Sequence, residues 1–120
     1  MIIREIKIDE RLVPFKASAA IPRIYRAKFG RDIFRDLVRL KKAVPEGGNE
    51  KGSDIQIDDL EMFENVAYIM AKHADPAQPE TPEEWMDQFD TFSIYEVLPQ
   101  LLALWYANTR TDVEAKKKRN

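Results

Sequence analysis

The chain has 120 residues, the length of one domain with a single hydrophobic core. It contains no cysteine, which excludes a disulfide framework and a thiolate metal site. It has no apolar run of ~18 residues and no charged-then-apolar leader, so we expect a cytoplasmic protein rather than a membrane or secreted one.

The formal net charge is −2, but the charges are unevenly distributed along the chain. Residues 1–44 carry a net charge of +7, residues 45–109 carry −12, and residues 110–120 carry +3. The two large blocks either form solvated faces that balance each other within one monomer, or they meet between subunits of a homo-oligomer.

The start of the chain predicts a β-hairpin over about residues 2–16. Side chains alternate between apolar and polar from Ile3 to Ile8, and residues 12–16 form a second short extended segment. Asp9 to Arg11 between them suit a turn. Pro14 lacks a backbone donor, which confines the second strand to an edge. Because a two-stranded ribbon is marginally stable alone, we expect it to lie against helices.

Two helices are predicted between the hairpin and residue 44. Ser18 suits a cap, Pro22 is tolerated in a first helical turn, and Gly30 supplies a left-handed end. Asp32 suits the cap of the second helix. The apolar face of that second helix is expected to contain Ile33, Phe34, Leu37, Val38 and Leu40, with Asp36 outside it.

Residues 45–57 predict a flexible loop, since they contain three of the four glycines in the chain. The segment Lys51-Gly52-Ser53 has neither the order nor the glycine spacing of a phosphate-binding P-loop. The acidic residues from Asp54 to Glu61 lack the alternating pattern and central glycine of a calcium-binding loop. The sequence therefore predicts neither site here.

Three more helices are predicted after the loop, so we expect a mainly α domain of about five helices behind the hairpin. The first runs from Asp58 to Ala74, with Asp58 and Glu61 as capping-box partners. Thr81 and the proline after it begin a second, short helix. The single histidine, His73, has no second ligand at metal-binding spacing, and we interpret it as a packing residue.

The segment from Ser93 to Asn108 predicts the helix around which the fold is organised. Nine of its sixteen residues are large and apolar, and they cover about twice the ~100° arc of an ordinary surface helix. Ser93 and Glu96 have capping-box spacing. We expect the face centred on Leu98 and Leu101 to be buried and an outer edge to bind a partner.

Five side chains are candidates for that partner-binding surface. Tyr95, Leu102 and Tyr106 lie about 60–100° from the centre of the core face, so they should be the most exposed large apolar residues of the helix. Trp85 and Phe89, one helix earlier, are candidates to extend the same patch. Aromatic side chains and methionines repack around varied partners, which suits such a surface, while core packing is the alternative interpretation.

No catalytic constellation is present in the sequence. The histidine has no cysteine or serine partner, and the acidic residues cluster at helix starts, where capping accounts for them. We therefore expect a protein that is not an enzyme and needs no metal or cofactor. Residues 1–109 form the single predicted domain, and the basic tail of residues 110–120 is expected to be disordered because it has one apolar residue larger than alanine.

Two stretches of the chain resemble a known family: FKASAAIPRIYRAKFGRDIFRDL (15–37) and WMDQFDTFSIYEVLPQLLALWYANTRTDVEAKKK (85–118). Together they are similar to the tail assembly chaperones of long-tailed bacteriophages and prophages. The most specific piece is the pattern W…F……IYEVLP…L.LW..N, which marks the family without indicating a mechanism. The resemblance covers most of the chain and leaves out the loop at 45–57.

The resemblance implies a small, mostly helical protein without enzymatic activity in the host bacterial cytoplasm. Such proteins coat the tape measure protein, keep it soluble, help recruit tail tube subunits, and are absent from the mature virion. The family also makes a longer form by ribosomal frameshifting, which implies a contact with the major tail tube protein. The run Lys116 to Lys118 stands where an adenine-rich slippery codon sequence would lie.

Residue patterns agree with this family function, because the two over-wide helices at 58–74 and 93–108 suit the binding of an amphipathic helix in a groove. Two other functions stay open. One is a structural tail-completion or connector protein that is retained in the virion. The other is a small regulator that binds nucleic acid through the basic residues of 21–42, although the acidic second half opposes it and no base-reading motif is recognisable.

Overall fold

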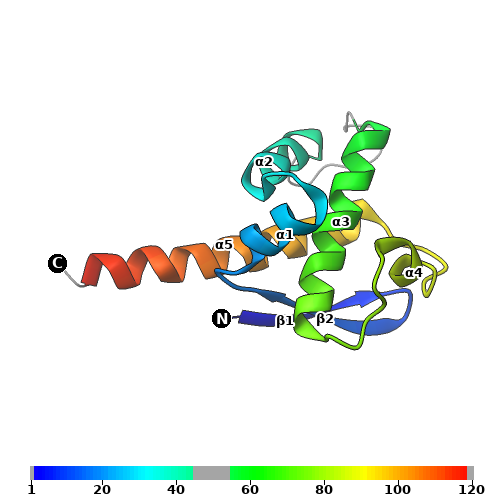
Figure 1. The fold of residues 1–120 in the computed structure, drawn as a ribbon, viewed down its shortest axis with the longest axis horizontal. Helices are drawn as coiled ribbons and strands as arrows, with labels where there is room; N and C mark the ends of the chain where they lie inside the picture. Colours follow the sequence, from blue (N-terminus) through cyan, green and yellow to red (C-terminus); the bar gives the residue numbers. More distant parts are fainter. Residues whose placement is uncertain (1, 45–54, 119–120) are drawn as a thin grey trace.

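The structure is a computed structural model that describes residues 2–44 and 55–118, with side chains described from residue 3 to residue 107 of these ranges. Its described part is a two-stranded antiparallel hairpin followed by five α-helices (Figure 1). The elements are β1 (Ile2–Ile8), β2 (Arg11–Ala17), α1 (Ile21–Phe29), α2 (Ile33–Ala43), α3 (Ile57–Ala74), α4 (Pro82–Met86) and α5 (Ile94–Lys118). The mainly α fold with an N-terminal hairpin is therefore confirmed; most of the predicted loop at 45–57 lies outside the described residues.

The hairpin turns through two residues with positive φ, Asp9 at 52° and Glu10 at 68°. Two consecutive positive φ angles are typical of a type I′ turn, whose twist matches that of the paired strands. The turn places Ile8 opposite Arg11 in a hydrogen-bonded pair, and such pairs alternate along the ribbon. Pro14 therefore lies in a pair without hydrogen bonds, opposite Glu5, where its missing N–H removes no hydrogen bond of the hairpin.

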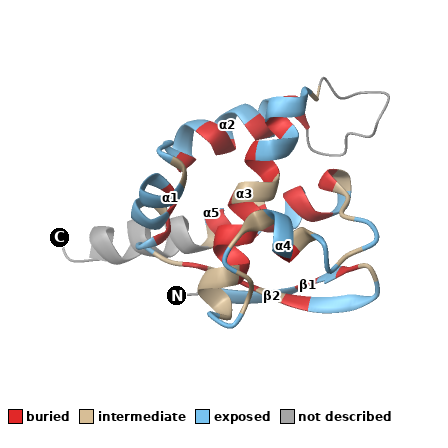
Figure 2. Cartoon of the chain, turned by 45° about the vertical axis from the view of Figure 1, so that its right-hand side comes forward, coloured by how far each residue is buried: buried red, intermediate tan, exposed pale blue. Residues whose placement is uncertain are grey.

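One face of the hairpin is buried against the helices, as the marginal stability of an isolated ribbon requires (Figure 2). The strands contact α3 and α5, with α3 lying mainly against β2. The buried residues of the ribbon are Ile6, Ile8, Val13, Phe15 and Ala17.

The ends of α1 and α2 follow the predicted signals closely. α1 ends at Gly30, whose φ of 68° is the left-handed conformation that glycine adopts without strain. The Asp32 carboxylate caps α2 by accepting a hydrogen bond of 2.9 Å from the Phe34 amide. The predicted cap at Ser18 is displaced: Ala20 is the N-cap of α1, and the Ser18 hydroxyl lies 2.9 Å from Nε2 of His73 on α3. The half-buried His73 thus forms a hydrogen bond with the segment before α1.

The capping box of α3 differs from the predicted pair. Gln56 is the N-cap, and the Asp59 carboxylate accepts a hydrogen bond of 3.0 Å from the Gln56 amide. The sequence favoured Asp58 and Glu61 because aspartate is the commoner cap. Asp59 takes this position because its carboxylate turns inward to Arg39 on α2, where Oδ1 lies 2.7 Å from Nε.

Trp85 on α4 is fully buried at the centre of an aromatic cluster. Its indole packs edge-on against Phe15 of β2 and Tyr68 of α3, with ring centroids 6.2 and 6.1 Å apart. Phe89 and Phe92, which follow α4, each lie 5.3 Å from it. These separations are within the favourable range for aromatic pairs. The cluster therefore joins the hairpin to α3, α4 and the segment that leads into α5.

α5 continues to Lys118, beyond the end predicted near Asn108 (Figure 1). The sequence had predicted a disordered tail there, whereas residues 109–118 have no glycine or proline and contain six strong helix formers, so the helical backbone continues without an apolar face. Residues 119–120 lie outside the described part. The predicted core face of α5 is confirmed, because Leu98 and Leu101 are both 0% exposed.

We predict that Leu98→Ala lowers the free energy of unfolding by ~2–5 kcal/mol, because it removes a fully buried side chain and leaves a cavity. Urea denaturation followed by circular dichroism measures the change. Leu12→Ala is the matched control, since the Leu12 side chain is 66% exposed on the hairpin and its loss should change stability by less than about 0.5 kcal/mol. Equal denaturation midpoints for Leu98→Ala and the parent would contradict the packing of α5.

Candidate partner-binding groove

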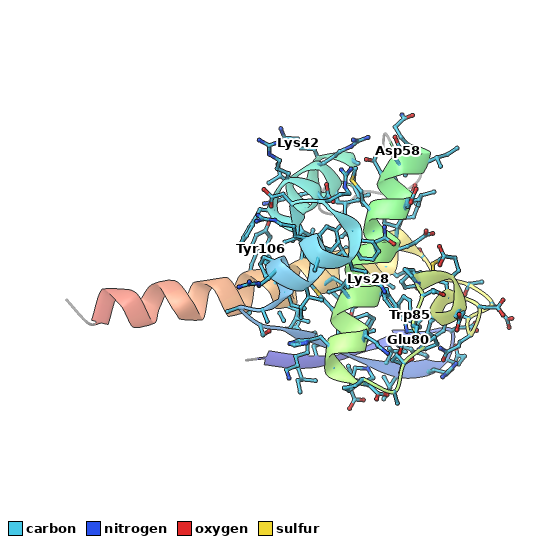
Figure 3. The ribbon with its side chains drawn as sticks, viewed as in Figure 1. Lys28, Lys42, Asp58, Glu80, Trp85 and Tyr106 are labelled. Carbon is cyan, nitrogen blue, oxygen red and sulfur yellow. The ribbon has the colours of Figure 1, made fainter. Side chains whose placement is uncertain are left out.

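An apolar groove runs between the C-terminal end of α2 and the middle of α5. Its volume is about 220 Å³, and most of the surface that lines it is apolar. The lining residues are Lys41, Val44, Leu98, Pro99, Leu102, Ala103 and Tyr106, the last of which is labelled in Figure 3.

The α5 wall of this groove contains two of the side chains that the sequence singled out. Tyr106 is 42% exposed, and Tyr95 and Leu102 are half-buried. The other six large apolar residues of the predicted segment are all buried, so Tyr95, Leu102 and Tyr106 are its most exposed members, as their angular position predicted. Leu102 and Tyr106 line the groove, while Tyr95 is not among its lining residues.

Trp85 and Phe89 do not extend this surface. Trp85 is 0% exposed, and Phe89 is half-buried against it, with the Arg11 guanidinium 5.4 Å above its ring centroid. α4 is only five residues long, and it directs its apolar side toward the hairpin. Helical spacing alone does not reveal this, because the direction is set by contacts with strands that are distant in sequence.

Two apolar residues of α2 are exposed, contrary to the prediction from the sequence. Phe34 is 52% exposed and Val38 is 53% exposed, although both were expected on the core face of α2. The Phe34 ring packs edge-on against Trp105 of α5 at 5.5 Å, one residue before the groove-lining Tyr106. Phe34, Val38 and Lys41 recur at i, i+4 and i+7, so two exposed apolar residues and a lysine form a row distinct from the buried one.

The buried side of α2 contains the carboxylate of Asp36 in addition to apolar residues. Asp36 is 3% exposed, although the sequence placed it outside. It accepts hydrogen bonds from Nε and Nη2 of Arg31, both at 2.8 Å, and from the Tyr25 hydroxyl at 2.7 Å. A bidentate guanidinium and a hydroxyl together donate hydrogen bonds to both carboxylate oxygens, which offsets the free-energy cost of burying the charge. The contacts of Asp36 with Arg31 and Tyr25, the polar anchor of α2, therefore hold the helix in the orientation that exposes Phe34 and Val38.

The contacts within this polar anchor shift the pKa values of Asp36 and Tyr25. Burial by itself raises the pKa of the Asp36 carboxyl, but the hydrogen bonds from Arg31 and Tyr25 outweigh it and hold that pKa below its usual value. Burial and the bond to Asp36 raise the pKa of the Tyr25 hydroxyl well above its usual range. The charged carboxylate and the neutral phenol are thus the forms that the fold stabilises.

A cation closes one side of the groove. Nζ of Lys41 on α2 lies 5.2 Å from the centroid of the Tyr106 ring on α5, a cation–π distance that links the two walls. Arg35 and Lys42 are exposed on the same helix. The groove therefore has an apolar floor and a cation, Lys41, on its α2 side, which suits the apolar stripe of an amphipathic helix.

No group of three or more His, Cys, Asp or Glu side chains in residues 3–44 and 55–107 is placed to hold a metal ion. No helix in the described part of the chain is long and apolar enough to span a membrane. No protein-family profile, curated protein or solved structure matches the chain.

We predict that Asp36→Asn lowers the free energy of unfolding at pH 7 by about 1.5–3 kcal/mol, the range for hydrogen bonds to a charged group. Because the pKa of Asp36 is lower in the folded state, its contribution is complete above the unfolded-state value and is lost as pH falls through the folded-state value. The difference between parent and variant should therefore shrink below about pH 4. Urea denaturation from pH 7 to pH 2.5 measures it.

Asp32→Asn serves as the control for this series, because asparagine caps a helix as well as aspartate and the Phe34 amide keeps its acceptor. A stability difference between parent and Asp36→Asn that is the same at every pH would contradict the charged form of the anchor.

Proposed function

We propose that this protein is a tail assembly chaperone of a long-tailed bacteriophage or prophage, which binds the tape measure protein and helps recruit tail tube subunits. The observation that carries the proposal is the apolar groove between α2 and α5. The second stretch with the family resemblance, residues 85–118, supplies the whole α5 wall of the groove. The resemblance and the groove thus point to the same surface.

The groove fits the chemistry of such a partner. From Leu98 to Tyr106 the α5 wall spans nine residues with a rise of about 12 Å, which matches about two turns of a docked helix. A tape measure protein presents long amphipathic helices before the tail tube encloses them. A short apolar groove without a catalytic constellation suits weak binding that is repeated along such a helix, where multivalency supplies the affinity.

The biological setting is part of the same proposal. The protein acts in the host bacterial cytoplasm, is absent from the mature virion, and contacts the major tail tube protein through a longer frameshifted form. A tail-completion or connector protein is the second candidate, and its presence in purified virions would favour it. An apolar groove supports a nucleic-acid-binding regulator less well, because phosphate contacts need a continuous basic surface.

We predict that Ala103→Glu and Tyr106→Glu each abolish the ability of the protein to keep its tape measure protein in the soluble fraction of co-expressing cells. Both residues are exposed, so the charge enters the groove without removing a buried side chain, and the melting temperature should change little. Quantitative gel analysis of soluble and insoluble fractions measures the effect.

Glu96→Lys is the matched control, because Glu96 is exposed on α5 and does not line the groove. It should leave both solubilisation and melting temperature unchanged. The proposal fails if the two groove variants fold normally and still solubilise the tape measure protein.

A further inference from the structure

A second groove lies between the N-terminal half of α3 and α4. Its volume is about 340 Å³, and its lining residues are Ile57, Leu60, Glu61, Glu64, Asn65, Pro82, Glu83 and Met86. Ile57 is 83% exposed and Leu60 is 38% exposed, so two large aliphatic side chains of one helix reach solvent in the same groove. Exposed apolar surface with a polar rim is typical of an interaction site.

The apolar part of this groove runs along two helical walls. On α3, Ile57 and Leu60 stand at i and i+3, so they project from one face of the helix. On α4, the half-buried Met86 follows Pro82 by four residues and belongs to the opposite wall. From Ile57 to Glu64 the α3 wall has a rise of about 10 Å, the length of two turns of a docked helix.

Three carboxylates surround this apolar part: Glu61 and Glu64 on α3, and Glu83 on α4. Among the described side chains, none of the three forms an ion pair. Burial, together with the charges of Glu61 and Glu83, raises the pKa of the half-buried Glu64 carboxyl above its usual value. The three negative charges therefore repel one another across the groove, and a cation placed among them would relieve the repulsion.

Two arginines lie in a neighbouring cavity but do not neutralise the groove. Arg31 and Arg39 line that cavity together with Glu61. Each guanidinium is bonded to a different carboxylate, Arg31 to Asp36 at 2.8 Å and Arg39 to Asp59 at 2.7 Å. Neither arginine lines the α3–α4 groove. The described side chains thus supply this groove with apolar and negative groups and with no cation.

We propose that the α3–α4 groove binds a basic amphipathic helix of another protein. Apolar side chains of that helix, one turn apart, cover Ile57 and Leu60, while its lysines or arginines lie beside the three glutamates. Charge complementarity sets the orientation of the contact and rejects acidic helices and nucleic acid, and burial of the aliphatic side chains holds it.

This inference goes beyond the proposed function and does not depend on it. The residues that line the α3–α4 groove are all different from those that line the α2–α5 groove. Figure 1 shows α2 and α4 on opposite sides of α3, so the two grooves are separate surfaces of one molecule.

A designed peptide tests the groove. The probe is a fluorescently labelled helical peptide of about 18 residues, with leucine along one face and lysine or arginine on both sides of that face. Fluorescence anisotropy during titration with the full chain should give a Kd of about 100 μM or tighter at ~0.05 M salt. The Kd should rise at least about fivefold at ~0.5 M salt, because exposed charges are screened.

Two variants separate the apolar contribution from the charged one. Ile57→Ser and Glu64→Gln should each weaken peptide binding at least about fivefold. Because Glu64→Gln also relieves the repulsion in the free protein, its melting temperature should not fall, so its loss of binding cannot come from unfolding. Leu12→Ser on the hairpin and Glu96→Gln on α5 are the matched controls, since both positions are exposed outside the groove, and both should bind like the parent.

Two control peptides test whether the groove recognises an amphipathic helix or only positive charge. A scrambled peptide of the same composition and a peptide with glutamate in place of each basic residue should both bind at least about tenfold more weakly than the probe. Equal binding of either control peptide, or unchanged affinity in Ile57→Ser and Glu64→Gln, would overturn the proposal. A Kd that rises with protein concentration would mean that a second copy occupies the groove, which would also overturn it.

Discussion

The structure depends on the burial of one stripe of α5. Leu98 and Leu101 are fully buried there, and the same helix contacts both strands of the hairpin and α3. A helix of this length with apolar residues over most of its circumference cannot be enclosed by a domain of 120 residues. The outer edge, with Leu102 and Tyr106, therefore stays partly exposed. The groove forms because the rest of the domain does not cover the whole apolar surface of α5.

The second wall of the groove is held by polar contacts rather than by close packing on α5. Arg31 and Tyr25 bind the buried Asp36 from the segment before α2, and Asp59 of α3 binds Arg39. These bonds fix the rotation of α2, so that Ile33, Leu37 and Leu40 face the core while Phe34 and Val38 face solvent. A helix oriented by apolar packing alone would turn those two residues inward.

Local signals in the sequence predicted the local structure well. Gly30 and Asp32 mark helix ends by their own backbone and side-chain chemistry, and Pro14 lies on an edge strand, as its missing donor predicted. The angular position of residues on α5 also predicted which of its apolar side chains stay exposed, because a helix with one dominant core contact has a single inner face.

The differences at Trp85 and Asp36 come from contacts that only the fold brings together. The burial of Trp85 depends on Phe15 and Tyr68, which are distant in sequence, and no spacing within α4 indicates it. The inward position of Asp36 depends on a partner five residues before it that only the fold brings into bidentate geometry. For the same reason the sequence located one wall of the groove, on α5, but not the row on α2 beside it.

The central claim is that the α2–α5 groove is the surface that meets the tape measure protein. Site-specific photo-cross-linking tests it most directly, with a photoreactive phenylalanine derivative at position 103 in the groove or at position 12 on the exposed hairpin. In cells that co-express both proteins, the groove position should give a cross-linked product with the tape measure protein and the hairpin position should give none. Cross-linking from the hairpin, with none from the groove, would contradict the account.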